Sequence, residues 1–158
     1  MLFRSEFAPA SIGELIDGAL DAFRPVLEQQ AFTIDIDIER GLPPIAEDGA
    51  AVIQAIENLI DNAIKYSADN KALRITARQH GDTVAITIAD RGIGIPAAEQ
   101  SRVFERFYRG RNNRATGSGL GLTLASRIVE HHHGQIRIAS KEGEGTEVTL
   151  TFPAGAAA

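Results

Sequence analysis

The chain has 158 residues, 44% of them hydrophobic, which suits one globular domain with its own core. It contains no cysteine, so disulfides and thiolate metal sites are excluded, and no apolar run reaches the roughly 20 residues that span a bilayer. The net charge of −5 argues against a general nucleic-acid binder.

The first part of the sequence predicts a helix followed by a strand. Ser11 is a plausible N-cap with Glu14 in capping-box position, and apolar residues at helical spacing continue the helix to about Glu28. Residues 32–38 alternate between apolar and polar side chains, which predicts a half-buried strand. The turn residues of 41–44 end that strand.

A helix that Asp48 can cap, running to about Ser67, has an unusual polar face. One side carries an apolar stripe of Val52, Ile56, Leu59, Ile60 and Ala63. The opposite side carries Asn58, Asn62 and Lys65, although Asn is a poor helix former. Amide oxygens can coordinate a hard cation and an ammonium can hold a phosphate. From this helix alone, an ordinary amphipathic helix whose polar face binds nothing is an equally good interpretation.

A predicted hairpin leads into an acidic glycine turn. Alternating runs at 73–77 and 84–88 flank His80-Gly81-Asp82, and the second run continues into Asp90-Arg91-Gly92-Ile93-Gly94-Ile95-Pro96. An ionised Asp90 can accept a hydrogen bond from an exocyclic amine, and Gly92 and Gly94 would let a flat ring approach the backbone. An ordinary Asp-x-Gly turn is the alternative.

The segment after this turn is short of regular structure. Residues 97–103 predict a short helix, which Phe104 and Phe107 follow. The polar stretch 110–118 has no periodicity and is interpreted as a mobile loop. Five arginines lie within thirteen positions in this region, which suits a small anionic ligand or an acidic partner: Arg102, Arg106, Arg109, Arg111 and Arg114.

The C-terminal part predicts one more helix and a closing hairpin. Gly119-Leu120-Gly121-Leu122 opens the helix, which ends at His131, His132 and His133, where cationic imidazoles suit the helix dipole, with Gly134 as a left-handed stop. Strands around Ile136 and Ile138 and around 148–152 flank the turn 142–145, and we expect a disordered tail at 154–158. Three adjacent histidines point around a helix, which disfavours a shared metal.

These elements predict an α+β fold: a two-layer α/β sandwich with a mixed sheet of about five strands and about three main helices. The alternation in the strands leaves one sheet face polar, so we expect the helices on the other face. No internal repeat or linker is apparent, and residues 1–153 are expected to form one domain.

Four motifs in a fixed order carry a resemblance to a known family. ENLIDNAIKYS (57–67), DRGIGIP (90–96), FERFYRG (104–110) and GSGLGL (117–122) resemble the N box, first glycine box, F box and second glycine box of bacterial two-component sensor histidine kinases. SKEGEGTEVTLTFP resembles the closing hairpin of the same domain. The chain is thereby similar to their catalytic ATP-binding domain, which has the Bergerat fold of the GHKL superfamily.

The resemblance implies a role for each matching residue. Asp90 would receive the adenine amine beside Gly92, Gly94 and Ile95, Tyr66 would pack near the adenine, and Asn62 would hold Mg²⁺. Asn58 and Lys65 would line the phosphate channel, and Glu57 is a weaker candidate for a base or for orienting the acceptor. Residues 109–118 would be the ATP lid, with Arg109, Arg111 and Arg114 as unranked candidates for the γ-phosphate. The second glycine box supplies the remaining contacts: Gly117, Ser118, Gly119, Leu120 and Gly121.

The implied reaction transfers the γ-phosphoryl group of Mg-ATP to a histidine on a separate dimerisation domain, with a response regulator further downstream. No histidine of this sequence matches that phosphoacceptor pattern, so the domain alone is expected to be inactive. The domain is also expected to be monomeric and cytoplasmic, without nucleic-acid contact or direct membrane contact. Gyrase-like ATPases place a glutamate at the position of Asn58, which favours the kinase. A binding module of the same fold, anti-sigma-like or degenerate, is the alternative.

Overall fold

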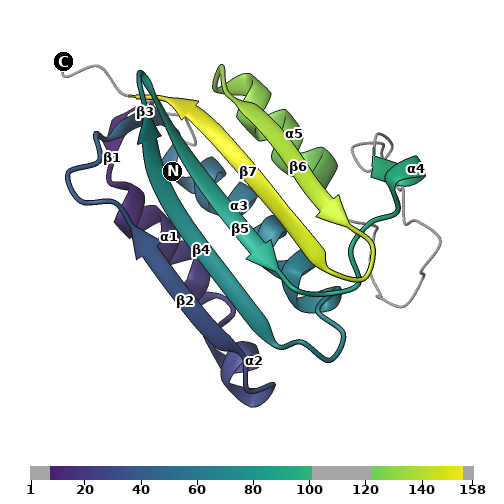
Figure 1. The fold of residues 1–158 in the computed structure, drawn as a ribbon. Helices are drawn as coiled ribbons and strands as arrows, with labels where there is room; N and C mark the ends of the chain where they lie inside the picture. The colour runs from purple at the N-terminus through teal and green to yellow at the C-terminus, as the bar shows by residue number, and fades with distance from the viewer. Residues whose placement is uncertain (1–7, 101–121, 155–158) are drawn as a thin grey trace.

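Five strands form one open sheet in the order β2-β4-β5-β7-β6 in the computed structural model, which describes residues 8–100 and 122–154 (Figure 1). The strands are β2 (Thr33–Ile38), β4 (Ala72–His80), β5 (Thr83–Asp90), β6 (Gln135–Lys141) and β7 (Gly145–Pro153). The β2–β4 pair is parallel, and the other three pairs are antiparallel. The prediction of a mixed five-stranded sheet with two hairpins is confirmed.

The helices are α1 (Ile12–Asp21), α2 (Arg24–Gln29), α3 (Gly49–Lys65), α4 (Ala97–Gln100) and α5 (Leu122–His131). The three longest lie on one face of this sheet, and the short α4 lies beside β6 (Figure 1). The three longest, α1, α3 and α5, pack side by side with α3 in the middle. A small antiparallel pair, β1 (Ala8–Ala10) with β3 (Ile45–Glu47), was not predicted.

Strand alternation explains why the helices cover only one side. In β4, β5 and β7 every second residue is a buried apolar side chain, whereas the residues between them are half-buried or exposed. The apolar rows meet the buried stripe of α3 that includes Val52, Ile56 and Leu59. The predicted two-layer α+β architecture is therefore confirmed. Within residues 8–100 and 122–154, none of the helices combines the length and the apolarity that crossing a bilayer requires.

The N-terminal helix is shorter than predicted. It breaks at Ala22 and Phe23, and a second helix begins at Arg24 with Pro25 in its first turn. Proline is favoured there because its missing N–H and fixed φ fit a helix start. Ser11 does occupy the N-cap position, but its side chain makes no capping hydrogen bond.

The strand expected at 32–38 is present, but it is less buried than expected. β2 is the edge strand, and five of its six residues are exposed, including Ile34 and Ile36. The helical layer covers the neighbouring strand β4 but leaves these two side chains partly open to solvent. Apolar alternation identifies a strand, but it does not say whether the opposite layer extends far enough to bury it.

Two predictions at the end of α5 are corrected. The left-handed residue is His133, with φ +61°, and not Gly134. Gly134 is required for another reason: a Cβ there would collide with the backbone carbonyl of Thr151 in β7. His132 is buried, and its Nε2 accepts a hydrogen bond from the Asp48 N–H (3.4 Å), which a cationic imidazole could not do.

Ala154, expected to belong to a disordered tail, is bonded to the sheet. Its N–H donates to the Asp82 carbonyl oxygen at 2.7 Å, which continues the pairing of β7 with β5 by one residue. Residues 155–158 lie outside the described part of the chain.

Candidate functional site

The polar face of α3 ends in a group of amide and charged side chains. Asp48 caps the helix as predicted, because its Oδ1 accepts from the N–H groups of Ala50 and Ala51 at 3.1 and 3.3 Å. Asn58 Nδ2 is buried without a hydrogen-bond partner among the described residues. The Lys65 ammonium lies 2.8 Å from Asp61 Oδ2, one helical turn away. The helix therefore presents an unsatisfied amide and a cation on its side away from the core.

Asp90 stands at the last position of β5, where the strand meets the glycine turn. Its Oδ1 accepts a hydrogen bond from the Gly92 N–H at 2.8 Å. Burial raises the pKa of Asp90 to about 6, although hydrogen bonds from the backbone of Gly92 and Thr146 act in the opposite direction. Since burial disfavours the ionised carboxylate, a further hydrogen-bond donor from a ligand would stabilise it.

The turn after Asp90 packs directly against the end of α3. The Ile93 N–H donates to the Tyr66 carbonyl oxygen at 3.0 Å, and Asn70 Nδ2 donates to the Arg91 carbonyl oxygen at 3.1 Å. A Cβ on Gly92 would collide with that same Tyr66 carbonyl. The first predicted glycine box and the C-terminal end of the predicted N box are therefore in contact, and only glycine fits between them.

The other side of the turn is fastened to the β6–β7 hairpin. Gly94 has φ +71° and faces the backbone of Lys141 so closely that a side chain would collide with it. Ser140 Oγ accepts from the Ile95 N–H at 2.8 Å, and Gln100 Nε2 donates to the carbonyl oxygens of Ile95 and Ser140, both at 2.9 Å. Residues 91–96 are consequently held between α3 and this hairpin.

Sequence reasoning did not identify the residues that fasten the turn. Ser140 and Thr146 lie in the stretch that resembles the closing hairpin, but that resemblance gives neither of them a role, and Gln100 belongs to no motif. Gly145 could have been predicted, because a glycine-rich turn often marks a place where two backbone segments lie close together. A Cβ there would collide with the Asp90 carbonyl oxygen.

Several predicted site residues lie outside the described residues. They are Arg109, Arg111, Arg114, Gly117, Ser118, Gly119, Leu120 and Gly121, together with the two phenylalanines Phe104 and Phe107. Of the remaining candidates, Glu57 and Asn62 are half-buried on α3. The described part of the chain thus contains the α3 face and the first glycine turn.

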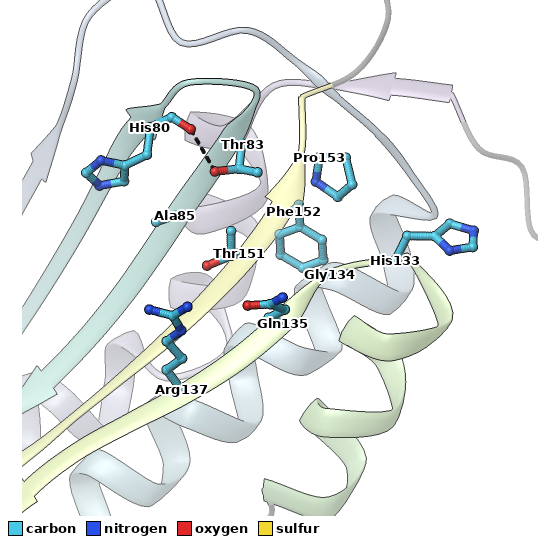
Figure 2. A pocket seen from close by; sticks show the side chains of 10 residues that line it. All are labelled: His80, Thr83, Ala85, His133, Gly134, Gln135, Arg137, Thr151, Phe152 and Pro153. Atoms are coloured by element: carbon cyan, nitrogen blue, oxygen red, sulfur yellow. Dashed lines mark hydrogen bonds between the residues drawn. The ribbon is translucent and has the colours of Figure 1, made fainter.

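Two surface hollows lie near the ends of the sheet. One, of about 440 Å³, is lined by Asp90 together with Ala89, Ala139 and Glu147 among others, and by no residue of α3. The other, of about 350 Å³, lies between His80 and His133 at the opposite end of β5 and β7 (Figure 2). Neither contains the amides of α3, so we place the candidate site on the helical side of the glycine turn.

The residues present fit a magnesium nucleotide. Among the described residues, no three or more His, Cys, Asp or Glu side chains gather to hold a metal ion. Mg²⁺ needs no such cage, because it commonly takes one or two protein oxygens and fills its coordination with phosphates and water. The half-buried amide of Asn62 can supply such an oxygen, and the unpartnered Nδ2 of Asn58 can donate to a phosphate oxygen. The half-buried Asp90 carboxylate matches an exocyclic amine.

Comparisons with known proteins show the family. The sequence profile of the histidine kinase-, DNA gyrase B- and HSP90-like ATPases matches residues 47–156. The sensor-like histidine kinase SenX3 of Mycobacterium tuberculosis is 41% identical over 126 residues, which are 76% of this chain and 31% of that protein. The adaptive-response sensory kinase SasA of Synechocystis is 33% identical over 153 residues, 96% of this chain and 40% of that protein. The chain therefore spans about a third of the length of such relatives.

Solved structures give the same result. The mycobacterial sensor histidine kinase MprB has a TM-score of 0.78 at 28% identity, with 93% of this chain and 98% of that one covered. Full-length ShkA, solved in complex with AMPPNP, has a TM-score of 0.83 at 26% identity and covers all of this chain with 33% of its own. The catalytic domain of the histidine kinase ThkA, at 22% identity and a TM-score of 0.83, shares the fold.

Proposed function

The chain belongs to the family of histidine kinase-, DNA gyrase B- and HSP90-like ATPases, as a catalytic ATP-binding domain of the sensor histidine kinase type, and we propose that it transfers the γ-phosphoryl group of Mg-ATP to a histidine on a separate phosphoacceptor domain. The observation that carries the proposal is the desolvated carboxylate of Asp90 on a glycine turn that packs against the end of the Asn-bearing helix. Carboxylate, amides and lysine supply the contacts that an adenine and a polyphosphate need.

The adenine end of the site is built from the turn. Asp90 would accept a hydrogen bond from the exocyclic amine of the base. It would use the carboxylate lone pairs that the backbone groups of Gly92 and Thr146 leave free. Gly92 and Gly94 would fix the position of the turn beside the base, because each is pressed against another backbone segment. The ring of Tyr66, half-buried where α3 ends, would pack beside the base.

The phosphate end of the site is the polar face of α3. Asn62 would hold Mg²⁺, whose charge offsets that of the phosphates, and Asn58 would gain the partner that its buried Nδ2 lacks among the described residues. Lys65 would exchange its contact with Asp61 for a phosphate oxygen. That exchange is inexpensive, because an exposed i,i+4 ion pair contributes only about 0.3–0.5 kcal/mol.

Transfer itself would depend mainly on position and charge. Phosphoryl transfer passes through a loose transition state that needs alignment and neutralisation more than covalent chemistry from the protein. Lys65 and a lid arginine, with Arg109 a candidate, would neutralise the phosphoryl oxygens. Glu57, half-buried one residue before Asn58, is proposed as the group that orients the incoming imidazole or takes its proton.

The phosphoacceptor would be a histidine of a dimerisation domain in a longer kinase, and a response regulator would receive the phosphoryl group from that histidine. The curated relatives are about three times as long as the part that this chain matches, which leaves room for such a domain in them. The isolated domain is proposed to be a monomer that turns over only when an acceptor is supplied.

The test is a transfer assay on a chimera that carries the phosphoacceptor domain of the SenX3 relative at the N-terminus. With radiolabelled Mg-ATP, the chimera is expected to gain an acid-labile phosphoryl group, and the Asn62→Ala chimera is expected to gain at least about 100-fold less. Calorimetry with Mg-ATP on the unfused chain and on its Asp90→Asn variant measures nucleotide binding separately from phosphoryl transfer. Binding without transfer in the chimera would identify a nucleotide-binding interaction module, and no binding by the folded chain would refute the nucleotide site.

A further inference from the structure

The free edge of the sheet combines features that a partner strand could use. β2 is its outermost strand on one side, and it has the repeating sequence Thr-Ile-Asp-Ile-Asp-Ile over 33–38. Its N–H groups alternate in direction, and those of Thr33 and Glu39 donate to the Lys71 and Ala77 carbonyl oxygens of the β4 side at 2.8 and 3.0 Å. By this alternation the backbone N–H and C=O groups of the even-numbered residues point away from the sheet.

The helical side of this edge is apolar and incompletely covered. Ile34 and Ile36 are paired in register with Leu73 and Ile75 of β4, which are buried. Yet 36% of Ile34 and 41% of Ile36 remain exposed, so the rest of the molecule covers them only in part. They are two of the three large hydrophobic side chains that are exposed within the described ranges, and they stand two residues apart on the same strand.

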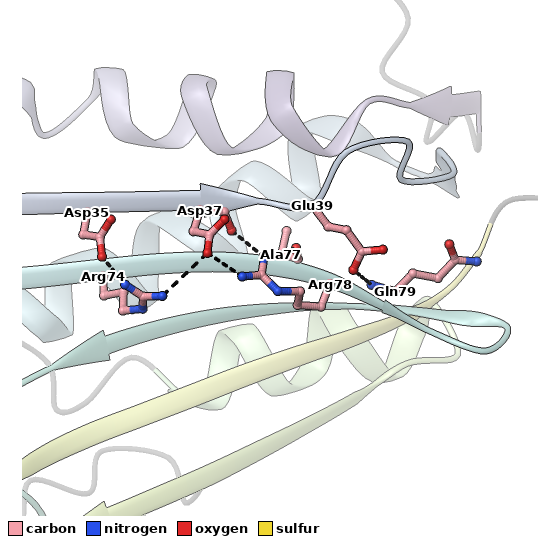
Figure 3. A network of polar contacts seen from close by, with 7 residues as sticks. All are labelled: Asp35, Asp37, Glu39, Arg74, Ala77, Arg78 and Gln79. Atoms are coloured by element: carbon pink, nitrogen blue, oxygen red, sulfur yellow. Dashed lines mark hydrogen bonds and ion pairs between the residues drawn. The ribbon is translucent and has the colours of Figure 1, made fainter.

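The open side of the same edge carries two partly exposed carboxylates. Asp35 and Asp37 alternate with the isoleucines, and ion pairs tie them to Arg74 and Arg78 of β4 (Figure 3). Their side chains remain 56% and 49% exposed. Since each carboxylate has two oxygens and several lone pairs, both can accept a further cation from the solvent side.

We propose that β2 is a docking edge for an extended segment in which apolar and basic residues alternate, added to the sheet as a sixth strand. The backbone groups of Ile34, Ile36 and Ile38 would supply the ladder. The apolar side chains of the segment would continue the Ile34–Ile36 row, and its basic side chains would meet Asp35 and Asp37. Strand addition of this kind takes affinity from the main chain and specificity from alternate side chains.

The charge pattern selects this occupant over a second copy of the chain. In an antiparallel pair of two β2 strands centred on Ile36, each Asp35 would face the Asp37 of the other copy. Like charges directly opposite each other destabilise a sheet. A segment with Lys or Arg at those positions would instead bring opposite charges together.

The test uses a fluorescein-labelled peptide, Lys-Val-Lys-Val-Lys-Val-Lys, and fluorescence anisotropy with the folded chain at 0.1 M salt. We expect saturable binding at least about tenfold tighter than that of Lys-Lys-Val-Val-Val-Lys-Lys, which has the same charge and composition but no alternation. A peptide with Glu in place of Lys is expected to bind weakly or not at all.

Two variants at one position isolate the backbone. Ile36→Pro removes an N–H that points away from β4, so the internal ladder should survive, because edge strands tolerate proline at such positions. It is expected to lose the peptide by about tenfold or more, whereas Ile36→Val, which keeps the N–H and the branched apolar side chain, is expected to bind normally. Should the proline variant not fold, a peptide N-methylated at every amide tests the same backbone pairing, because it removes the N–H groups of the peptide instead of that of Ile36.

Three results would overturn the proposal. Equal affinity for the two lysine peptides would mean simple attraction of a cation to an acidic protein. Undiminished binding by folded Ile36→Pro, or by the N-methylated peptide, would exclude backbone pairing at this edge. A dimer in sedimentation that Ile36→Pro dissolves would identify the occupant as a second copy. None of these results bears on nucleotide binding, which is measured separately with Mg-ATP.

Discussion

Asp90 is placed where its proposed role conflicts with the stability of the fold. Burial raises the pKa of its carboxyl from 3.8 to about 6. Between these two values the folded chain binds more protons at this site than the unfolded chain, so the contribution of Asp90 to stability is full below pH 3.8 and is lost as the pH rises through 6. At neutral pH the domain therefore holds an ionised carboxylate against a desolvation cost.

The Asp90→Asn variant is expected to be more stable than the natural chain at pH 7.5, by about 1–2 kcal/mol. The amide has no charge to desolvate, and its oxygen can still accept from the Gly92 N–H. The difference should shrink towards zero near pH 4. Urea unfolding of both chains at the two pH values checks this, and a variant less stable at pH 7.5 would contradict the account.

Nucleotide affinity is expected to fall as Asp90 takes up a proton. With a pKa of about 6, the carboxylate is almost fully ionised at pH 7.5 and only about one-tenth ionised at pH 5. Binding of Mg-ADP should weaken by up to about tenfold over this range from this group alone. Asp90→Asn corrects for the titration of the phosphates, because its profile should lack the component near pH 6. Parallel calorimetric profiles for the two chains would refute the assignment.

The sequence predicted the roles of residues that belong to one motif. It did not predict the roles of residues that only the fold brings together. The candidate carboxylate and its glycines follow one another in the chain, so Asp90, Gly92 and Gly94 could be selected together. Ser140 could not, because its role arises only when the β6–β7 hairpin reaches the Ile95 N–H. The exposure of Ile36 was missed for the same reason, since the edge of the helical layer is set by three-dimensional packing.

At the scale of elements, a buried histidine links the two helices that border the candidate site. His132 Nδ1 lies 2.6 Å from the Ile128 carbonyl oxygen, so Nδ1 carries the proton, and Nε2 accepts from the N–H of Asp48, the N-cap of α3. The end of α5 and the start of α3 thus share one neutral imidazole. Periodicity placed both helices correctly but could not reveal this contact between residues 84 positions apart.

The His132→Ala variant is expected to lower the free energy of unfolding by about 2–3 kcal/mol, because it leaves a cavity and an unpaired backbone donor. His80→Ala is the matched control: that imidazole is exposed at the end of β4, and its loss should change stability by less than about 0.5 kcal/mol. Denaturant titrations give both values. A His132→Ala chain as stable as the control would show that the bond to Asp48 contributes nothing.

For the whole molecule, the layer architecture followed from the sequence because local and global signals agree. Alternation in β4, β5 and β7 points the same way as the apolar stripe of α3, and consistency across levels specifies one fold. The predictions failed at the α1–α2 break, at β2 and in the small β1–β3 pair. The break has a local signal in Pro25, at the start of α2. The exposure of β2 depends instead on how far the core extends, which no local pattern encodes.

The link between site and fold predicts that Mg-ATP stabilises the whole domain. A ligand that binds only the folded chain raises the free energy of unfolding by RT ln(1 + [L]/Kd), about 2.7 kcal/mol at 100 times Kd. EDTA should remove the magnesium-dependent part of this gain, and Asn62→Ala should lose that same part while keeping the rest. Asp90→Asn should lose more of the gain, because it weakens contact with the base. Thermal unfolding with and without nucleotide measures each part, and a gain in Asn62→Ala that remained fully sensitive to EDTA would place the metal on other residues.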